Sequence, residues 1–81
     1  MPSSEKYRRI HELLKDVFPK DEIPNDSSNL AMGDLPSWDS LGNFNLILAI
    51  ETEFSVRFSM EQMTKIKSVT GIVEALEAGN D

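Results

Sequence analysis

The stretch Trp38-Asp39-Ser40-Leu41-Gly42 places a serine where a long polar segment gives way to an apolar run with helical spacing. Asp39 suits the N-cap of a helix, because its carboxylate can accept a hydrogen bond from a first-turn N–H. Ser40 would then lie where free N–H groups and the helix dipole favour a negatively charged group. Asp and Ser open many helices, so the tripeptide alone is weak evidence. With support from the rest of the chain, it predicts a serine that accepts a phosphodiester.

The sequence offers no partner that would activate this serine for catalysis. A nucleophilic serine needs a base within hydrogen-bond reach. His11 is the single histidine, and its charged neighbours on a predicted helix indicate a solvated surface residue. The sequence has no Gly-x-Ser-x-Gly elbow, phosphate-binding glycine loop or His/Cys cluster, and Asp26, Asp34 and Asp39 lack the EF-hand spacing. We therefore predict no catalytic residue and no metal site, and interpret Ser40 as the substrate of another protein.

Size and composition favour one small soluble domain spanning residues 1–81. The chain has 81 residues, of which 40% are hydrophobic and 27% charged, an ordinary globular composition. It has no cysteine, so neither a disulfide framework nor a thiolate metal site is expected. No apolar run reaches the length of a membrane span, and the N-terminus does not resemble a secretory signal. We expect a cytoplasmic monomer.

Negative charge is concentrated in the middle of the chain. The net charge is −6, and the segment from Asp21 to Val56 has no Lys or Arg. Its acidic residues are Asp21, Glu22, Asp26, Asp34, Asp39, Glu51 and Glu53. This field would repel nucleic acid and attract a basic patch on a partner protein.

The hydrophobic periodicity predicts an all-α fold, a small four-helix bundle. A first helix is expected over about residues 4–18, followed by a long loop over 19–38. The most apolar helix should extend from Leu41 to Phe54. Ser59 and Gln62 match a capping box that opens a short third helix, and Ser68 can cap a last helix.

With these elements in place, the sequence resembles the acyl carrier proteins over almost its whole length. The resemblance rests on Asp39-Ser40-Leu41, then Leu46, Leu48, Ile50-Glu51, Glu53-Phe54 and Ile66. It implies that a phosphopantetheinyl transferase attaches 4′-phosphopantetheine to Ser40, with Asp39 and Leu41 flanking the attachment site. The arm would hold acyl or aminoacyl groups as thioesters, as in lipid or polyketide biosynthesis, and present them to loading and processing enzymes.

The resemblance also suggests further sites. Asp39, Glu51 and Glu53 would meet basic docking patches on partner enzymes. Leu48, Met60, Met63 and Ile66 would line a shelter for the acyl chain, although such residues can equally fill a core.

Some residues depart from the pattern of fatty-acid-synthesis carriers. Gly42 and Asn45 stand where those proteins often have acids, and Trp38 before Asp39-Ser40 is more typical of stand-alone carriers of dedicated pathways. We therefore expect a carrier that serves a specialised pathway. The alternatives are a housekeeping carrier of fatty acid synthesis, a helical interaction adaptor in which Asp39-Ser40 only caps a helix, and a small serine hydrolase.

Overall fold

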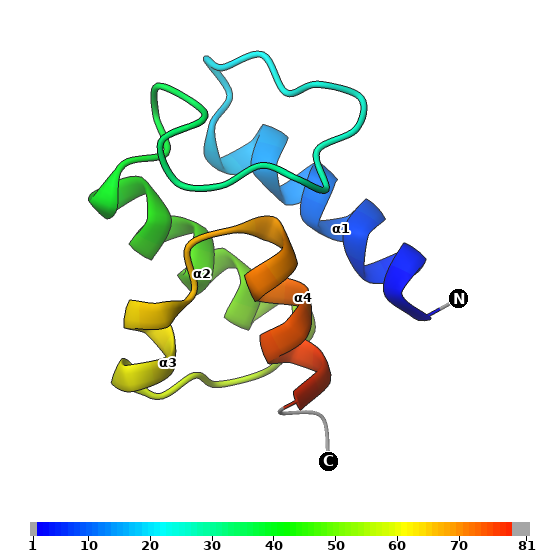
Figure 1. Ribbon diagram of the computed structural model, residues 1–81, viewed down its shortest axis with the longest axis vertical. Coiled ribbons are helices and arrows are strands. Elements are labelled where there is room, and N and C mark those ends of the chain that lie inside the picture. The colour runs from blue at the N-terminus through cyan, green and yellow to red at the C-terminus, as the bar shows by residue number, and fades with distance from the viewer. Residues whose placement is uncertain (1, 79–81) are drawn as a thin grey trace.

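Helices α1 (Pro2–Val17), α2 (Ser40–Phe54), α3 (Met60–Lys65) and α4 (Val69–Ala78) form the regular structure of the computed structural model (Figure 1). The model describes residues 2–78, and their side chains from residue 5 onward. The described residues contain no strand, so the predicted all-α fold with a long loop and a short third helix is confirmed. The first helix starts at Pro2, slightly earlier than expected.

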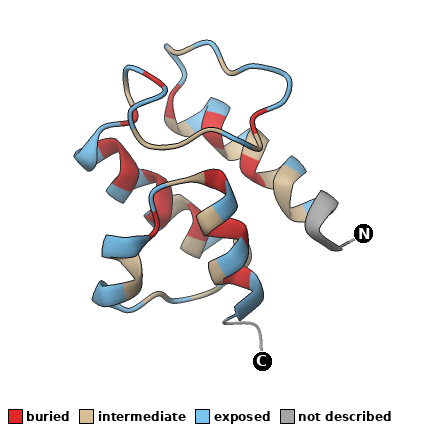
Figure 2. Ribbon diagram, in the orientation of Figure 1, coloured by how far each residue is buried: buried red, intermediate tan, exposed pale blue. Residues whose placement is uncertain are grey.

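The core forms where the apolar faces of α1, α2 and α4 meet (Figure 2). Each helix contributes residues at three- and four-residue steps, as the periodicity predicts. The helical segments contribute Ile10, Leu14 and Phe18 from α1 and the residue after it; Leu46, Ile47 and Ile50 from α2; and Val69, Ile72, Val73 and Leu76 from α4. Leu35 and Trp38 of the loop and Ile66 after α3 complete the cluster. Helix α3 has no buried residue and lies on the opposite side of the bundle from α1 (Figure 1).

Hydrogen bonds join the long loop to the segment that precedes α4. The N–H of Met32 donates to the carbonyl oxygen of Lys67 over 2.8 Å, and Ala31 and Ser68 form an isolated antiparallel bridge. The two ends of the loop are joined to each other, because Asp21 accepts hydrogen bonds from the N–H and the hydroxyl of Ser37, at 2.8 and 2.9 Å. The loop is thus fixed by contacts between residues far apart in the sequence.

His11 is not the solvated residue that its charged neighbours suggested. Its Nδ1 lies 2.8 Å from the hydroxyl oxygen of Ser27, and Ser27 is buried. The prediction was wrong because the helical pattern cannot show that the long loop returns to cover this part of α1.

Candidate functional site

Helix α2 begins at Ser40, as the sequence predicts. The Asp39 carboxylate accepts a hydrogen bond from the N–H of Gly42 over 2.8 Å, and the Asp39 carbonyl accepts one from the N–H of Asn43 over 2.7 Å. The predicted N-cap is therefore confirmed. Within the described part of the chain, the N–H groups of Ser40 and Leu41 have no partner. Both of these residues are exposed, so the start of the helix presents a hydroxyl group and two free donors to solvent.

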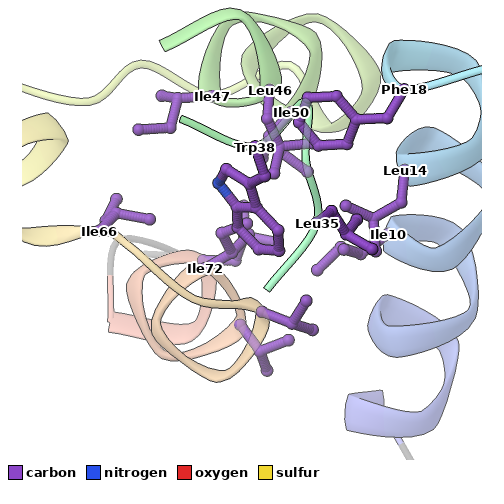
Figure 3. Packing of buried hydrophobic residues seen from close by; sticks show 13 residues of the cluster. Ile10, Leu14, Phe18, Leu35, Trp38, Leu46, Ile47, Ile50, Ile66 and Ile72 are labelled. Atoms are coloured by element: carbon purple, nitrogen blue, oxygen red, sulfur yellow. The ribbon is translucent and has the colours of Figure 1, made fainter. Parts of the chain in front are cut away.

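The residue before the cap anchors this segment in the core. Trp38 is fully buried, and its ring stacks on that of Phe18 with 5.9 Å between the centroids. Figure 3 shows Trp38 within the hydrophobic cluster, with Phe18 and Leu14 on one side and Ile66 on another. Because a buried tryptophan N–H needs an acceptor, the position of this ring is also fixed by hydrogen bonding.

Asn43 provides that acceptor. Its Oδ1 accepts a hydrogen bond from Nε1 of Trp38 over 2.8 Å, and its Nδ2 donates to the carbonyl oxygen of Ile66, also over 2.8 Å. The side chain is 7% exposed, so both bonds are buried. This arrangement, called the Trp38–Asn43–Ile66 bridge below, links the start of α2 to the residue that follows α3.

Gly42 allows the loop to pack closely against the first turn of α2. A Cβ at this position would overlap the carbonyl oxygen of Ser37 and would lie 3.1 Å from Cε1 of Phe18. Since Ser37 is held by Asp21, the loop cannot easily move away. The glycine is required by packing in a segment that positions Ser40.

A hollow of about 360 Å³ lies beside Ser40, between α2, α3 and the loop. Apolar side chains make up most of its wall, with polar groups among them. Its lining residues are Met32, Ser40, Asn43, Phe44, Ile47, Met60, Met63, Thr64 and Lys67.

The four residues predicted to line an acyl-chain shelter divide into two pairs. Met60 and Met63 line the hollow. Leu48 is 41% exposed and Ile66 is 4% exposed in the core, and neither is among the lining residues. The helical pattern placed all four on apolar faces, but it could not tell which of these faces point toward Ser40.

The acidic residues predicted to meet partners make contacts within the chain. Glu53 pairs with Arg9 of α1, with 2.8 Å between Oε2 and Nη2. Oε2 of Glu51 accepts a hydrogen bond from the N–H of Phe58 over 2.7 Å and so fixes the turn after α2. Asp39 caps α2. All three have structural roles, of which the sequence indicated only the cap of Asp39, and their role in partner binding stays a prediction.

The sequence analysis missed six of the lining residues, namely Met32, Asn43, Phe44, Ile47, Thr64 and Lys67. For Asn43 the sequence contained a usable signal. It lies three, four and seven residues before Leu46, Ile47 and Ile50, on the buried face of the helix. A polar residue at such a position indicates a buried hydrogen bond. Lys67 and Met32 gave no such signal, because the loop and the segment before α4 bring them to the hollow.

In residues 2–78, no group of three or more His, Asp or Glu side chains is placed to hold a metal ion. None of the helices in that range is both long enough and apolar enough to cross a membrane.

The fold and the site define a small helical protein that exposes a serine at the start of its most apolar helix. The chain is 31% identical over 72 residues to the acyl carrier protein of Coprothermobacter proteolyticus, covering 89% of this chain and 87% of that protein. No protein-family model matches, and no solved structure matches significantly. On the strength of the relative, the chain belongs to the acyl carrier protein family. Members of this family are carriers and not enzymes.

Proposed function

We propose that Ser40 carries 4′-phosphopantetheine, the prosthetic group that acyl carrier proteins generally bear. The observation that carries this proposal is the exposed Ser40 at the first position of α2, beside the hollow. The residues present fit the group. The hydroxyl is accessible to a transferase, and the free N–H groups of Ser40 and Leu41 suit a phosphodiester at the positive end of the helix dipole. When bound, the group would supply a terminal thiol that holds acyl or aminoacyl cargo as a thioester.

The residues around Ser40 have distinct supporting roles in this proposal. Asp39 directs its carboxylate to the N–H of Gly42, so it starts the helix without occupying the first two N–H groups. Met60 and Met63 give the hollow a flexible apolar wall that can adapt to an attached group. Leu41 is 69% exposed next to Ser40 and offers an apolar contact to an approaching enzyme.

The partners in this proposal are a phosphopantetheinyl transferase and the enzymes that load and process the cargo, as the family implies in general terms. Asp39, Glu51 and Glu53 would contribute to the negative field that attracts basic docking patches. Helix α2 is uncharged from Ser40 to Ile50, so charge recognition would depend on the residues at its two ends.

We further propose a specialised biosynthetic pathway rather than housekeeping fatty acid synthesis. Gly42 and Asn45 stand where fatty-acid-synthesis carriers often have acids, and Gly42 is also required by packing against Ser37. The start of α2 packs around a large aromatic ring, because Trp38 is buried and donates a hydrogen bond to Asn43. The mass of the material bound to the protein isolated from its own cells would identify the cargo.

Modification of Ser40 can be tested directly by intact mass. The apo protein is incubated with coenzyme A, magnesium and a broad-specificity transferase. We expect the addition of one phosphopantetheine to the wild type and to Ser55→Ala, a matched control that removes an exposed serine at the other end of α2. Ser40→Ala should remain unmodified. Absence of the added mass on the wild type, or its presence on Ser40→Ala, would refute the proposal and favour an interaction adaptor.

A further inference from the structure

We infer that the Trp38–Asn43–Ile66 bridge closes the inner wall of the hollow, so that this carrier shelters only short acyl groups and leaves the end of a long chain in solvent. The inference rests on the proposed attachment of the arm to Ser40. Asn43 is the central residue, because it lines the hollow although only 7% of its surface is exposed. A chain attached at Ser40 that entered the core beside Asn43 would have to displace its carboxamide.

Displacing this carboxamide would break two buried hydrogen bonds. Oδ1 accepts from the Trp38 ring and Nδ2 donates to the Ile66 carbonyl, both at 2.8 Å. An aliphatic chain offers neither a donor nor an acceptor, so the indole N–H and the carbonyl would be left buried without partners. Unpaired polar groups in a core are strongly unfavourable. Among the described residues, no buried side-chain polar atom lacks a partner in the present arrangement.

The space behind the bridge is already filled. Ile66 is 4% exposed, and Val69 and Ile72 of α4 are fully buried. Figure 3 shows Ile66 and Ile72 near the Trp38 ring on the side facing α4. Protein cores are close-packed, so a long chain would also have to push these residues apart.

The hollow outside the bridge has limited capacity. Its volume of about 360 Å³ corresponds to roughly a dozen groups of the size of a water molecule. The end of the arm together with a dodecanoyl chain exceeds that number of groups, so part of a long chain would extend into solvent. Thr64 and Lys67 add polar groups to its otherwise largely apolar wall.

A chain-length series on the wild-type protein tests the inference. A broad-specificity transferase is used to load acetyl, butyryl, octanoyl and dodecanoyl groups from their coenzyme A esters, and intact mass confirms each product. If none of the four groups is loaded, the proposed function is refuted, and the inferred limit on sheltered chain length with it. The rate of thioester cleavage by hydroxylamine then measures shelter. We expect octanoyl and dodecanoyl rates within twofold of the butyryl rate, whereas protection of more than twofold on dodecanoyl would overturn the inference.

The single tryptophan gives a second readout on the same samples, because the chain has one indole N–H signal. We expect the chemical shift of this signal to be the same with every acyl group. A displacement that grows with chain length would show that the chain enters the bridge, and would overturn the inference.

Trp38→Phe removes the indole donor and keeps an aromatic ring. If the bridge excludes long chains, this variant should protect dodecanoyl at least threefold relative to butyryl, while the exposed control Asn45→Ala should behave like the wild type. Circular dichroism establishes that each variant is folded. A folded Trp38→Phe with rates independent of chain length would overturn the assignment to the bridge. If that variant does not fold, the chain-length series on the wild type decides whether long chains are sheltered.

Discussion

Arg9 of α1 and Glu53 near the end of α2 form an ion pair of 2.8 Å, and the same guanidinium lies 4.4 Å from the centroid of the Phe54 ring. Nη2 of Arg9 also donates to the backbone carbonyl of Glu53 over 3.1 Å. Because one arginine makes all these contacts, it fixes the end of α2 against α1, at the opposite end of α2 from Ser40. Glu53 therefore has a structural role apart from any role in docking.

Charge reversal at Glu53 tests this structural role. Glu53→Lys replaces an attraction to Arg9 by a repulsion, so we expect the free energy of unfolding to fall by about 0.5–1 kcal/mol, the upper part of the range for exposed pairs. Glu74→Lys, an exposed position on α4, causes the same change in net charge and should stay within about 0.5 kcal/mol of the wild type. Urea unfolding measures both. Equal losses of unfolding free energy in the two variants would show that net charge, and not the contact with Arg9, determines the effect.

Gly42→Ala should destabilise the protein even though alanine favours helices. The new methyl group would overlap the Ser37 carbonyl oxygen and crowd Phe18. Overpacking of this kind typically costs about 1–3 kcal/mol, and we expect a net loss in that range by thermal or urea unfolding. Asn45→Ala, exposed on the same helix, should change stability by less than about 0.5 kcal/mol. A stabilised Gly42→Ala would show that the loop can move away.

Ser55→Gly should stabilise the protein. Ser55 ends α2 in the left-handed conformation, with φ 56° and ψ 47°, and this conformation costs a non-glycine L-residue about 1–2 kcal/mol. Glycine avoids that cost but loses more backbone entropy on folding, so we expect a net gain of about 0.5–1 kcal/mol. Ser55→Val should have the opposite effect, because a β-branched side chain is least tolerated there. Thermal unfolding of the wild type, Ser55→Gly and Ser55→Val measures their order of stability. A Ser55→Val protein as stable as the wild type or more so would show that the turn adjusts to the larger side chain.

The pKa of Asp26 should be lower than that of an ordinary aspartate. The Ser28 hydroxyl donates to its carboxylate over 2.6 Å and the Ser28 N–H over 3.2 Å, and both bonds lower this pKa. A lowered folded-state pKa contributes stability above the ordinary aspartate value, and that stability is lost as the pH falls through the lowered value. The effect on stability should be small because the group is exposed. An NMR titration of the carboxyl carbon should show the low pKa, and Ser28→Ala should raise it, whereas an unchanged value would contradict this contact.

Features set by neighbouring residues could be predicted from the sequence. The Asp39 cap, the Ser59–Gln62 capping box and the Ser68 cap each depend on residues three positions apart, and all are present. The apolar stripes predicted the core of the helices for the same reason. These signals were sufficient to place Ser40 at the start of a helix.

Features set by the approach of distant segments could not be predicted. The pairs Arg9–Glu53 and His11–Ser27 join residues separated by 44 and 16 positions. The hollow likewise depends on how α3 and the loop meet α2. A helical pattern specifies which face is buried but not which neighbour covers it, so Leu48 and Ile66 were expected beside the hollow and lie elsewhere.

Helix α3 has no buried residue, so few apolar contacts hold it against the rest of the domain. Local opening requires least free energy where the fewest apolar contacts are lost, and here that element is the outer wall of the hollow. The wall opposite is Asn43, held by two buried bonds. One side of the cavity can therefore yield to an incoming group while the other stays fixed, so adaptation to different cargoes would come from the two methionines of α3.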